Sequence, residues 1–516
     1  MPAKLTICMP ASEVAPFSKT GGLADVVAAL TKYLHGDGHD VRVVTPCYAG
    51  VDLRGLEAQP VAGLQQVPLA VGPHCYVFSV LRAPLPGSAA PVYLIDCPAL
   101  YARAGLYTGD ADEHLRFLAL TRAVFVICAQ LRWAAQIIHC NDWHTGFAPL
   151  FLKARYRGDA LFAATRTVLT IHNIGYQGIF PATQLADLAL AGQTSLLHPG
   201  DLAAGRINAL RHGILYADAI TTVSPTHARE ICTDEYGMGL QDSLRARAAV
   251  LSGILNGVDY EEWDPRGDRH LPVHYGPDTL AGKAALKRQF LARMHLDGSR
   301  EAPLAGIVSR LAAQKGIELM FETLPRVLGE RALVLAVLGK GEPRYEEFFA
   351  ELARSFPGRV GFECGYDEDL AHWIEAASDL FLMPSRYEPC GLNQMYSLRY
   401  GTVPIVRRTG GLADSVEHYD PDSGTGTGVV FNDFDPPAFE WALNTALDLY
   451  ATPAHWRRLM MNGMQRDFSW HRQAAEYLAL YRRLIAHPGR AHRRIPRRPA
   501  AGRTPSGGSA RRPIAD

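Results

Sequence analysis

One hexapeptide, Thr-Gly-Gly-Leu-Ala-Asp, occurs twice in this chain of 516 residues, at positions 20–25 and again at 409–414. Each copy follows a basic residue, Lys19 or Arg408, and continues into sequence that favours a helix. Two adjacent glycines let a backbone approach a ligand closely, and the free amides at a helix start attract an anion. A single copy is compatible with an ordinary helix start. Two copies, one in each half, predict two similar domains that face one phosphorylated ligand.

Short apolar runs alternate with helical patterns through both halves of the chain. The first half contains strand-like runs such as KLTICMP, DVRVVTP and TVLTIHN, and a second series follows residue 254 with LAGIVSRL, ALVLAVLG and DLFLMPS. A chain of this length exceeds one ordinary core. The alternation is typical of parallel sheets covered by helices on both faces. We therefore expect an α/β fold with two doubly wound domains, residues 1–250 and 251–460.

The remaining residues predict a final helix and a basic tail. An amphipathic pattern predicts the helix within residues 461–486, and its periodicity does not decide whether it returns to the first domain. Residues 487–516 carry eight arginines among Pro, Gly, Ser and Ala, a composition that predicts disorder. Such a tail can contact nucleic acid but is more often a solvated extension, so no nucleic-acid partner is predicted.

The composition excludes several classes of protein. No apolar run is long enough to span a bilayer, and the N-terminus lacks the features of a signal peptide. The nine cysteines have no CxxC spacing and are odd in number. We therefore expect a soluble cytoplasmic protein with reduced thiols and no membrane partner. Neither half has the G-x-G-x-x-G fingerprint, which is evidence against a nicotinamide-dependent oxidoreductase.

Two basic motifs lie where strands are expected to end. Lys19 precedes Gly21 and Gly22 in a loop after the first strand, so an ammonium group and backbone amides can reach one phosphate. Arg310 and Lys315 flank a strand-to-helix turn, where both can converge on a diphosphate and stabilise charge on a leaving group. Two surface cations at a helix start are the alternative. Cations there oppose the helix dipole, which favours an anionic ligand.

Further polar motifs at strand ends suggest a sugar ligand. Proline and glycine in Arg-Tyr-Glu-Pro-Cys-Gly-Leu aim Glu388 outward, where its carboxylate can accept hydrogen bonds from sugar hydroxyls. Cys390 in this motif is more typical of a small packed residue than of a nucleophile. The segments 139–144 and 170–175 contain histidines and an aspartate, but their spacing matches no zinc motif. We therefore predict neither a metal nor a cofactor.

Together these motifs resemble those of bacterial glycogen synthases and the related starch synthases. The resemblance covers residues 4 to about 485 and rests on SKTGGLADVV, HCNDWHTG, TIHNIGYQGIF, ILNGVD, SRLAAQKG, YEPCGLNQMYSLRYGTVPIV and RRTGGLADSV. It implies a GT-B fold, in which two Rossmann-like domains face each other across a deep cleft. It also implies transfer of glucose from ADP-glucose to the 4-hydroxyl at the nonreducing end of an α-1,4-glucan such as glycogen, with retained configuration and no metal.

The resemblance assigns a phosphate-binding role to residues from both halves. Lys19 and the amides of Gly21 and Gly22 would hold the distal phosphate from the N-terminal side. Arg310 and Lys315 would hold the same diphosphate from the other domain and stabilise the departing ADP.

The resemblance also places residues around the transferred glucose. Glu388 would bind its hydroxyls, helped by the backbone amides of Cys390, Gly391 and Leu392. His172 and Asn173 would approach this glucose near the anomeric centre and the 6-hydroxyl. Lys19, His172, Arg310, Lys315 and Glu388 are therefore the expected catalytic residues.

The other expected substrate-binding residues have less direct roles. Asp142 would lie near the donor sugar and the acceptor, Asn256 near the sugar at the hinge, and Tyr366 would stack on adenine. Asp25 would shape its loop or contact the donor. The second hexapeptide would supply a loop of the donor pocket through Thr409, Gly410 and Gly411.

One departure and several rival functions remain open in the sequence. Many broader GT-B relatives carry a second glutamate eight positions after Glu388, where this chain has Tyr396, so the ribose contact of that acid is in doubt. A UDP-glucose-dependent synthase, a glucan phosphorylase and a non-catalytic glucan-binding protein are the rivals. The residues alone do not distinguish ADP-glucose from UDP-glucose, and they do not indicate an oligomeric state.

Overall fold

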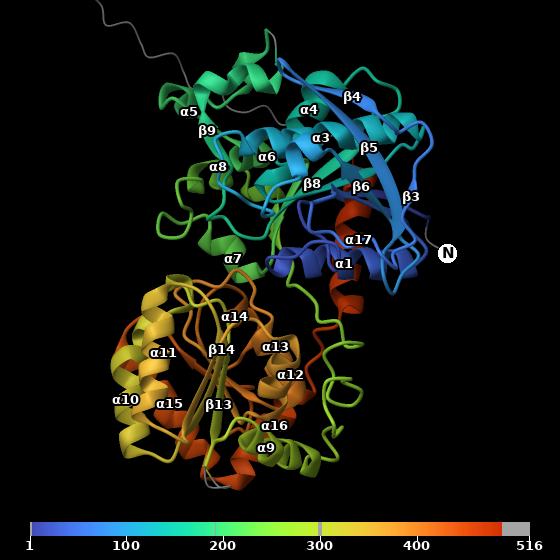
Figure 1. The fold of residues 1–516 in the computed structure, drawn as a ribbon. Coiled ribbons are helices and arrows are strands. Elements are labelled where there is room, and N and C mark those ends of the chain that lie inside the picture. The colour runs from blue at the N-terminus through green and yellow to red at the C-terminus, as the bar shows by residue number, and fades with distance from the viewer. Residues whose placement is uncertain (1–2, 191, 298–301, 488–516) are drawn as a thin grey trace, which may run out of the picture.

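A computed structural model describes residues 3–190, 192–297 and 302–487 of the chain (Figure 1). The N-terminal domain is built on a sheet in the order β12-β11-β8-β7-β1-β2-β6-β5-β3, with β4 paired to β5. Its strands are β1 (Thr6–Pro10), β2 (Asp40–Pro46), β3 (Gln59–Pro60), β4 (Val67–Val71), β5 (His74–Pro84), β6 (Pro91–Asp96), β7 (Ile137–Asn141), β8 (Arg166–Ile171), β11 (Ala219–Thr222) and β12 (Leu251–Gly253). A separate antiparallel pair consists of β9 (Ile179–Pro181) and β10 (Arg206–Asn208).

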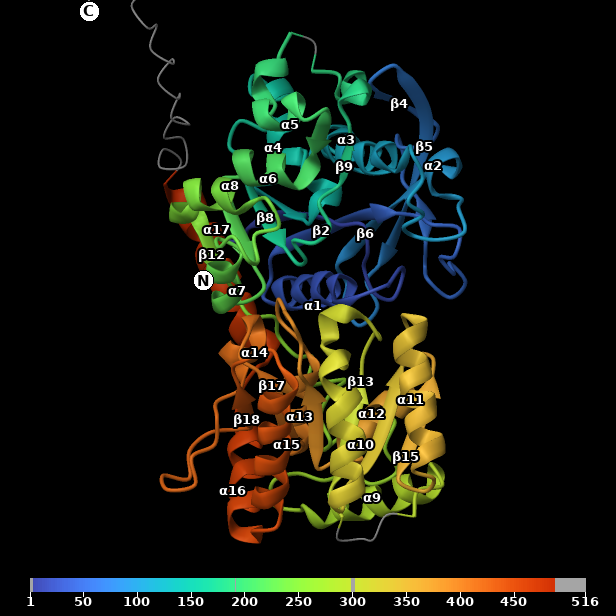
Figure 2. The ribbon, with the colours of Figure 1, turned by 90° about the vertical axis from the view of Figure 1, so that its left-hand side faces the viewer.

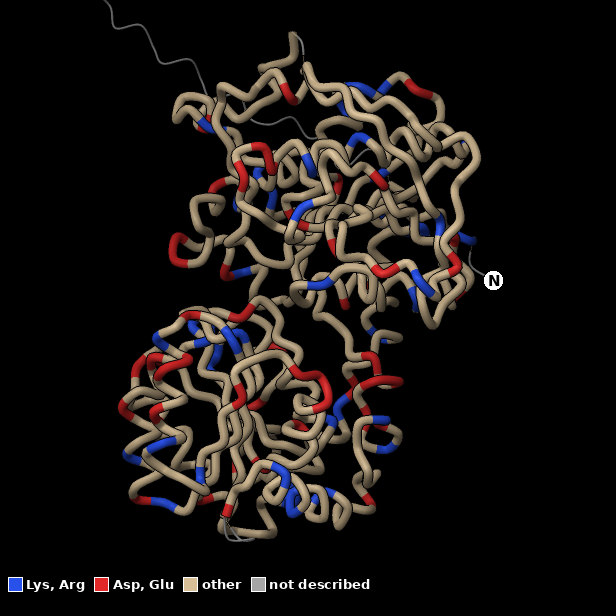
Figure 3. The backbone as a smooth tube through the Cα atoms, in the orientation of Figure 1, with Lys and Arg blue, Asp and Glu red and all other residues tan. Residues whose placement is uncertain are grey.

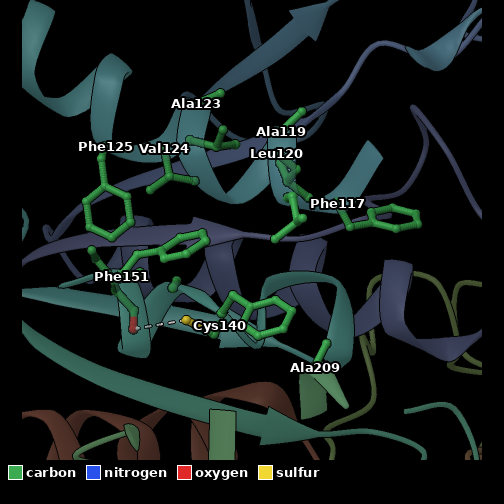
Figure 4. Close-up of a cluster of buried hydrophobic side chains, with 14 of the residues drawn as sticks. Phe117, Ala119, Leu120, Ala123, Val124, Phe125, Cys140, Phe151 and Ala209 are labelled. Carbon is green, nitrogen blue, oxygen red and sulfur yellow. Dashed lines mark hydrogen bonds between the residues drawn. The ribbon is translucent and has the colours of Figure 1, made fainter. Parts of the chain in front are cut away.

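The helices of this domain cover the sheet and bury its core. They are α1 (Gly22–Gly36), α2 (Pro98–Tyr101), α3 (Glu113–Gln130), α4 (Ala148–Arg155), α5 (Pro199–Ala203), α6 (Ala209–Tyr216), α7 (Pro225–Glu230) and α8 (Gln241–Ala246), with short 3-10 turns at Trp143–Thr145, Ala182–Leu188, Thr194–Leu196 and Ala248–Val250. Helix α3 is buried around most of its circumference, because it is apolar on more than one face. Phe117, Leu120 and Val124 of α3 lie over Cys140 of β7 and Phe151 of α4 (Figure 4).

The C-terminal domain has a parallel six-stranded sheet in the order β15-β14-β13-β16-β17-β18. Its strands are β13 (Leu304–Val308), β14 (Val334–Gly339), β15 (Val360–Cys364), β16 (Leu380–Met383), β17 (Val403–Arg407) and β18 (Val429–Phe431). Its helices are α9 (Ala281–Arg293), α10 (Met320–Glu330), α11 (Pro343–Ser355), α12 (Glu368–Ala377), α13 (Asn393–Tyr400), α14 (Gly410–Ser415), α15 (Pro436–Tyr450) and α16 (Pro453–Met464), with 3-10 turns at Ala313–Lys315 and Ile317–Leu319. Figure 2 shows helices on both faces of this sheet.

The last described helix, α17 (Trp470–Ala486), crosses back to the N-terminal domain. Trp470, Tyr477 and Tyr481 are buried in one cluster with α1 and β1, and the Tyr481 hydroxyl lies 2.6 Å from His139 Nδ1. The chain therefore passes between the domains twice, near residue 256 and near residue 469, where Val258 N donates to Phe468 O at 2.7 Å. Residues 488–516, which include most of the expected basic tail, lie outside the described residues.

The predicted fold class is confirmed, with one difference in the first sheet. Seven of its strands are parallel, but β3, β4 and β5 join the sheet or each other antiparallel. Gly72, with φ +58°, occupies the first position of the two-residue β4–β5 turn, which suits a tight hairpin. A hairpin turn of this kind is local and interrupts the strand–helix alternation that predicts a parallel sheet.

Charged residues of both signs are interspersed over the two domains (Figure 3), in agreement with a formal net charge of zero. Within the described residues, no helix is long and apolar enough to cross a membrane.

Candidate active site between the two domains

The predicted motifs lie at the carboxyl ends of strands in both sheets, and the two sets of loops meet where the domains face each other. A Cβ atom added to Gly22 would lie 3.9 Å from Leu392 Cδ1, and one added to Gly175 would lie 3.9 Å from the Tyr387 hydroxyl. Loops after β1 and β8 therefore approach the loop after β16. Ligands of open parallel sheets bind at this edge.

The first hexapeptide leaves an open helix start. Gly21 is the N-cap of α1, and no side chain caps the helix there. A Cβ on Gly21 would meet no atom of the described residues within 4 Å. Lys19 Nζ lies 2.8 Å from Asp25 Oδ1. Burial lowers the pKa of Lys19, but the Asp25 carboxylate outweighs this and raises it, so the lysine is charged. An ammonium group thus stands beside unused amides, as a phosphate site requires.

The loop that carries Lys19 is held by a residue the sequence did not single out. The carboxylate of Glu13 accepts a hydrogen bond from Thr20 Oγ1 at 2.8 Å and another, shorter one from the Thr20 backbone amide. The Tyr107 hydroxyl donates to the same carboxylate at 2.5 Å, and its ring stacks on His144 with centroids 5.0 Å apart. Neither Glu13 nor Tyr107 belongs to a recognisable motif, because both act through partners distant in sequence.

An ion pair on the C-terminal side of the site joins Lys315 and Glu388. Lys315 Nζ lies 2.6 Å from Glu388 Oε2, and Ser385 Oγ donates to the same oxygen at 3.1 Å. Glu388 is only 5% exposed, so its carboxylate is largely shielded from water. Gly316 allows this pairing, since a Cβ there would lie 2.0 Å from Pro384 O. Arg310, which like Lys315 follows strand β13, is exposed.

The loop that follows Glu388 curves sharply toward the first domain. Gly391 has φ +72°, and Cys390 is buried with its thiol pKa raised to about 12 by burial. A thiol with that pKa is protonated at neutral pH, so Cys390 is not an activated nucleophile. Asn256, also expected near the sugar, is buried, and its Oδ1 has no hydrogen-bond partner among the described residues.

Asp142 and His172 meet on the N-terminal side. Asp142 has φ +52°, an uncommon conformation for a residue with a side chain. Its Oδ1 accepts from His172 N at 2.7 Å and from Asn173 N at 3.4 Å, so it connects the loops after β7 and β8. His172 Nε2 lies 2.9 Å from Asn141 Oδ1. Burial lowers the pKa of His172 to about 3, so this histidine is neutral at physiological pH.

The other two histidines of these motifs have structural surroundings. His139 is buried between Tyr481 and Thr170, with Nε2 2.5 Å from Thr170 Oγ1. His144 is buried and packs against Phe117 and Tyr107.

Two expected aromatic positions differ strongly in exposure. Tyr366 is 78% exposed, and its electrostatic neighbours include Lys19 and Asp25 of the facing domain. It is thus free to stack on a planar base. Tyr396, which replaces the second glutamate of broader relatives, stacks on Trp263 with centroids 4.0 Å apart and planes 1° apart. This position therefore contributes a packed ring instead of a carboxylate.

The helix start of the second hexapeptide is capped by a side chain, whereas that of the first is not. The amide of Gly410 donates to both carboxylate oxygens of Glu230, at 3.0 and 3.1 Å, and Thr409 Oγ1 donates to the same side chain at 3.0 Å. The amide of Gly411 donates to Glu388 O at 3.0 Å. Thr409, Gly410 and Gly411 are buried behind the loop that carries Glu388. Glu230 thus occupies this helix start, and a direct contact of these residues with the donor stays a prediction.

The two hexapeptides should therefore respond differently to alanine. A Cβ on Gly410 would lie 1.9 Å from Glu388 O, and its φ is +43°. We expect Gly410→Ala to lower the free energy of unfolding by about 2–4 kcal/mol. Gly21→Ala, in extended backbone, should change it by less than about 1 kcal/mol. Denaturant unfolding of both variants measures the difference, and equal losses would contradict the assigned packing.

The burial of Asp142 leads us to expect that the stability of the protein depends on pH. Burial raises its pKa to about 7, although the His172 and Asn173 amides oppose the shift. Between about pH 4 and 7 the folded protein then holds a proton that the unfolded chain releases, so stability falls as pH rises. We expect the free energy of unfolding of Asp142→Asn, relative to that of the wild type, to rise by about 1 kcal/mol per pH unit across this window. Parallel unfolding curves for the two proteins between pH 5 and 7.5 would contradict this expectation.

The sequence matches known proteins along nearly the whole chain. Residues 6–246 match the family described as starch synthase catalytic domain, and residues 297–459 match glycosyl transferases group 1. The glycogen synthase of Anaeromyxobacter dehalogenans (strain 2CP-C) is 47% identical over 485 residues, which cover 93% of this chain and 100% of that protein. The chain belongs to the glycogen and starch synthase family.

Other members of the glycogen and starch synthase family give the same result. The glycogen synthase of Myxococcus xanthus is 45% identical over 492 residues, covering 93% of this chain and 100% of that protein. The catalytic domain of Starch Synthase IV from Arabidopsis thaliana, solved bound to ADP and acarbose, superposes with a TM-score of 0.87 at 33% identity. That alignment covers 94% of this chain and 100% of that chain. The protein is therefore a glycosyltransferase with the GT-B fold.

Proposed function

We propose that this protein is a glycogen synthase, which transfers glucose from ADP-glucose to the nonreducing 4-hydroxyl of an α-1,4-glucan and releases ADP. The observation that carries the proposal is the pair of Lys315 and the buried Glu388, 2.6 Å apart, at the edge that faces the Lys19 loop. It provides a cation for a phosphate and a carboxylate for sugar hydroxyls side by side. The family membership supports the same activity.

The arrangement favours activation of the leaving group. Lys315 and Arg310 from one domain and Lys19 from the other would stabilise the negative charge that grows on the diphosphate as its bond to the anomeric carbon breaks. The acceptor hydroxyl would form the new bond from the same face and pass its proton to the departing phosphate oxygen, which retains the configuration. A retaining glycosidase instead needs two carboxylates about 5 Å apart, with one as nucleophile. Glu388 is already engaged by Lys315.

Neutral His172 and the neighbouring Asn173 can contribute hydrogen bonds to the transferred sugar without adding a charge. Asp142 holds both backbone amides, at 2.7 and 3.4 Å, and so orients this pair. Tyr366 is the residue available for the adenine ring. We propose ADP-glucose as donor, since the Arabidopsis Starch Synthase IV domain is described as bound to ADP.

Parallel transfer assays test the proposal. Purified protein is incubated with glycogen and with ADP-glucose or UDP-glucose labelled in the sugar, and label in the polymer is counted. We expect rapid incorporation from ADP-glucose and much slower incorporation from UDP-glucose. Preference for UDP-glucose would overturn the donor assignment, and no incorporation from either would overturn the activity. An absorbance band from pyridoxal phosphate would instead indicate a phosphorylase.

Domain closure on the nucleotide is part of the proposal, because the phosphate ligands come from two domains. Small-angle scattering should show a smaller radius of gyration with saturating ADP than without it. An unchanged radius would argue against closure. We also propose a cytoplasmic location, since all nine cysteines lie in the described residues and are free thiols.

A further inference from the structure

Two short helices from different domains cap each other at the domain boundary. At the start of α7, Thr226 N and Thr226 Oγ1 each donate to the carboxylate of Asp414, both at 2.7 Å. At the start of α14, Thr409 Oγ1 and Gly410 N donate to the carboxylate of Glu230 at 3.0 Å. We call these contacts the reciprocal clamp. Figures 1 and 2 both show α7 directly above α14.

The clamp is built from charged groups with favourable surroundings. A carboxylate at a helix start interacts well with the helix dipole and with the free amides, and both carboxylates have this position. Burial raises the pKa of Glu230, but His227, the Gly410 amide and Thr409 outweigh it and lower the pKa, so Glu230 is ionised at neutral pH. His227 Nδ1 lies 3.7 Å from this carboxylate.

The same two helices hold the backbone of the sugar-binding loop. The Gly411 amide at the start of α14 donates to Glu388 O at 3.0 Å, and Ser224, the N-cap of α7, donates through Oγ to Pro389 O at 2.7 Å. A Cβ on Gly411 would lie 2.0 Å from Cys390 O, so α14 packs directly against the loop. The N-terminal domain therefore fixes the Glu388 backbone through α7 itself and through α14.

The clamp lies at the opposite edge of the C-terminal sheet from the base-binding residue. Helix α14 follows β17, next to the edge strand β18, whereas Tyr366 follows β15 at the other edge. Lys19 is an electrostatic neighbour of Tyr366, so its side chain reaches toward that far edge, although Gly22 of the same loop approaches Leu392. A rotation about the clamp would separate Lys19 from Tyr366 and move Glu388 little relative to the N-terminal domain.

We propose that Glu230 and Asp414 are positioning residues, and that the reciprocal clamp is a pivot that keeps residues 388–392 in register with His172 while the phosphate side opens and closes. This inference rests on the proposed function for its kinetic consequence. Its mechanical consequence does not depend on which sugar is transferred.

Isosteric variants test the kinetic consequence. Glu230→Gln and Asp414→Asn keep shape and remove one charge each. We expect each to lower kcat by about 10- to 100-fold, with the KM for ADP-glucose changed less than about threefold, since a small displacement near the reacting atoms has this size of effect. Thr226→Ser should retain wild-type kcat and Thr226→Val should lose activity, because only serine keeps the hydroxyl. Unchanged kcat in both charge variants, or equal losses for serine and valine, would overturn the proposal.

An ion pair between helix α1 and the linker provides the control. Lys32 Nζ lies 3.0 Å from Asp259 Oδ2 and 2.5 Å from Glu261 Oε2, both in the segment that links the domains, and within the described residues it has no hydrogen bond or ion pair with residues 388–392. Lys32→Met removes a charged contact between the N-terminal domain and the linker but leaves the clamp intact. It should leave kcat within about twofold of wild type, since Asp259 and Glu261 belong neither to the clamp nor to residues 388–392. A loss in Lys32→Met as large as in Glu230→Gln would overturn the special role of the clamp.

Scattering separates failure of this inference from failure of the proposed function. With ADP alone as the ligand, the wild type should contract, and Glu230→Gln should keep a larger radius of gyration with ADP than the wild type. If no glucose transfer is found but Glu230→Gln alters the ADP response, the activity is wrong and the pivot stands. If transfer is found and Glu230→Gln contracts as the wild type does with unchanged kcat, the pivot is wrong.

Discussion

Lys315→Ala should lower kcat for glucose transfer by about 10²- to 10³-fold. The lysine is held 2.6 Å from the buried Glu388 carboxylate, so its ammonium group is fixed before the diphosphate departs. Preorganised charge of this kind stabilises a leaving group without reorganisation during the reaction, and removing one such group has effects of this order. Steady-state assays with ADP-glucose and glycogen measure the loss.

Arg331→Ala is the matched control for charge loss in the same domain. Arg331 Nη2 lies 2.7 Å from Asp448 Oδ1; Arg331 directly follows the C-terminal end of α10, and Asp448 lies on α15. This variant should retain wild-type kcat. Near wild-type turnover in Lys315→Ala would show that the lysine does not stabilise the departing ADP. The melting temperature of each variant distinguishes a catalytic loss from unfolding.

Glu388→Gln should lower kcat by about 10²-fold, through a different contact. The carboxylate accepts hydrogen bonds from Lys315 and Ser385 and would also accept them from the glucose hydroxyls. Hydrogen bonds to an ionised acceptor are about twice as strong as those between neutral groups. An amide keeps the shape and can still accept through its oxygen, but it is neutral and therefore holds the Lys315 ammonium group and the glucose hydroxyls less strongly. A variant with wild-type kcat would exclude Glu388 from sugar binding.

The double variant tests whether the two residues act as one unit. If Lys315 is positioned by Glu388, the combined loss in Lys315→Ala with Glu388→Gln should be smaller than the product of the single losses, because the second substitution removes a group already misplaced. Strictly multiplicative losses would mean that the ion pair seen between them has no role in turnover. Each single variant changes one side chain and retains the rest of its loop, so the losses can be compared directly.

Much of the fold and of the candidate site could be predicted from local sequence. The alternation of apolar runs and helical patterns predicts two α/β domains, since strands and helices are specified by short-range periodicity. Glycines next to basic or acidic residues predict ligand-binding loops at strand ends. Lys19, Lys315 and Glu388 are predicted in this way, and the structure brings their loops to one boundary. The β4–β5 hairpin was missed, because one Gly-Pro turn interrupts the pattern.

The two copies of Thr-Gly-Gly-Leu-Ala-Asp mark the limit of that prediction. The sequence by itself determined two helix starts with close backbone approach, because adjacent glycines allow it in either domain. Only the tertiary structure decided that the first start is open beside Lys19, while Glu230 closes the second from 180 residues away in sequence. The physical reason is that a glycine turn depends on its own backbone, whereas a capping partner depends on how two domains pack.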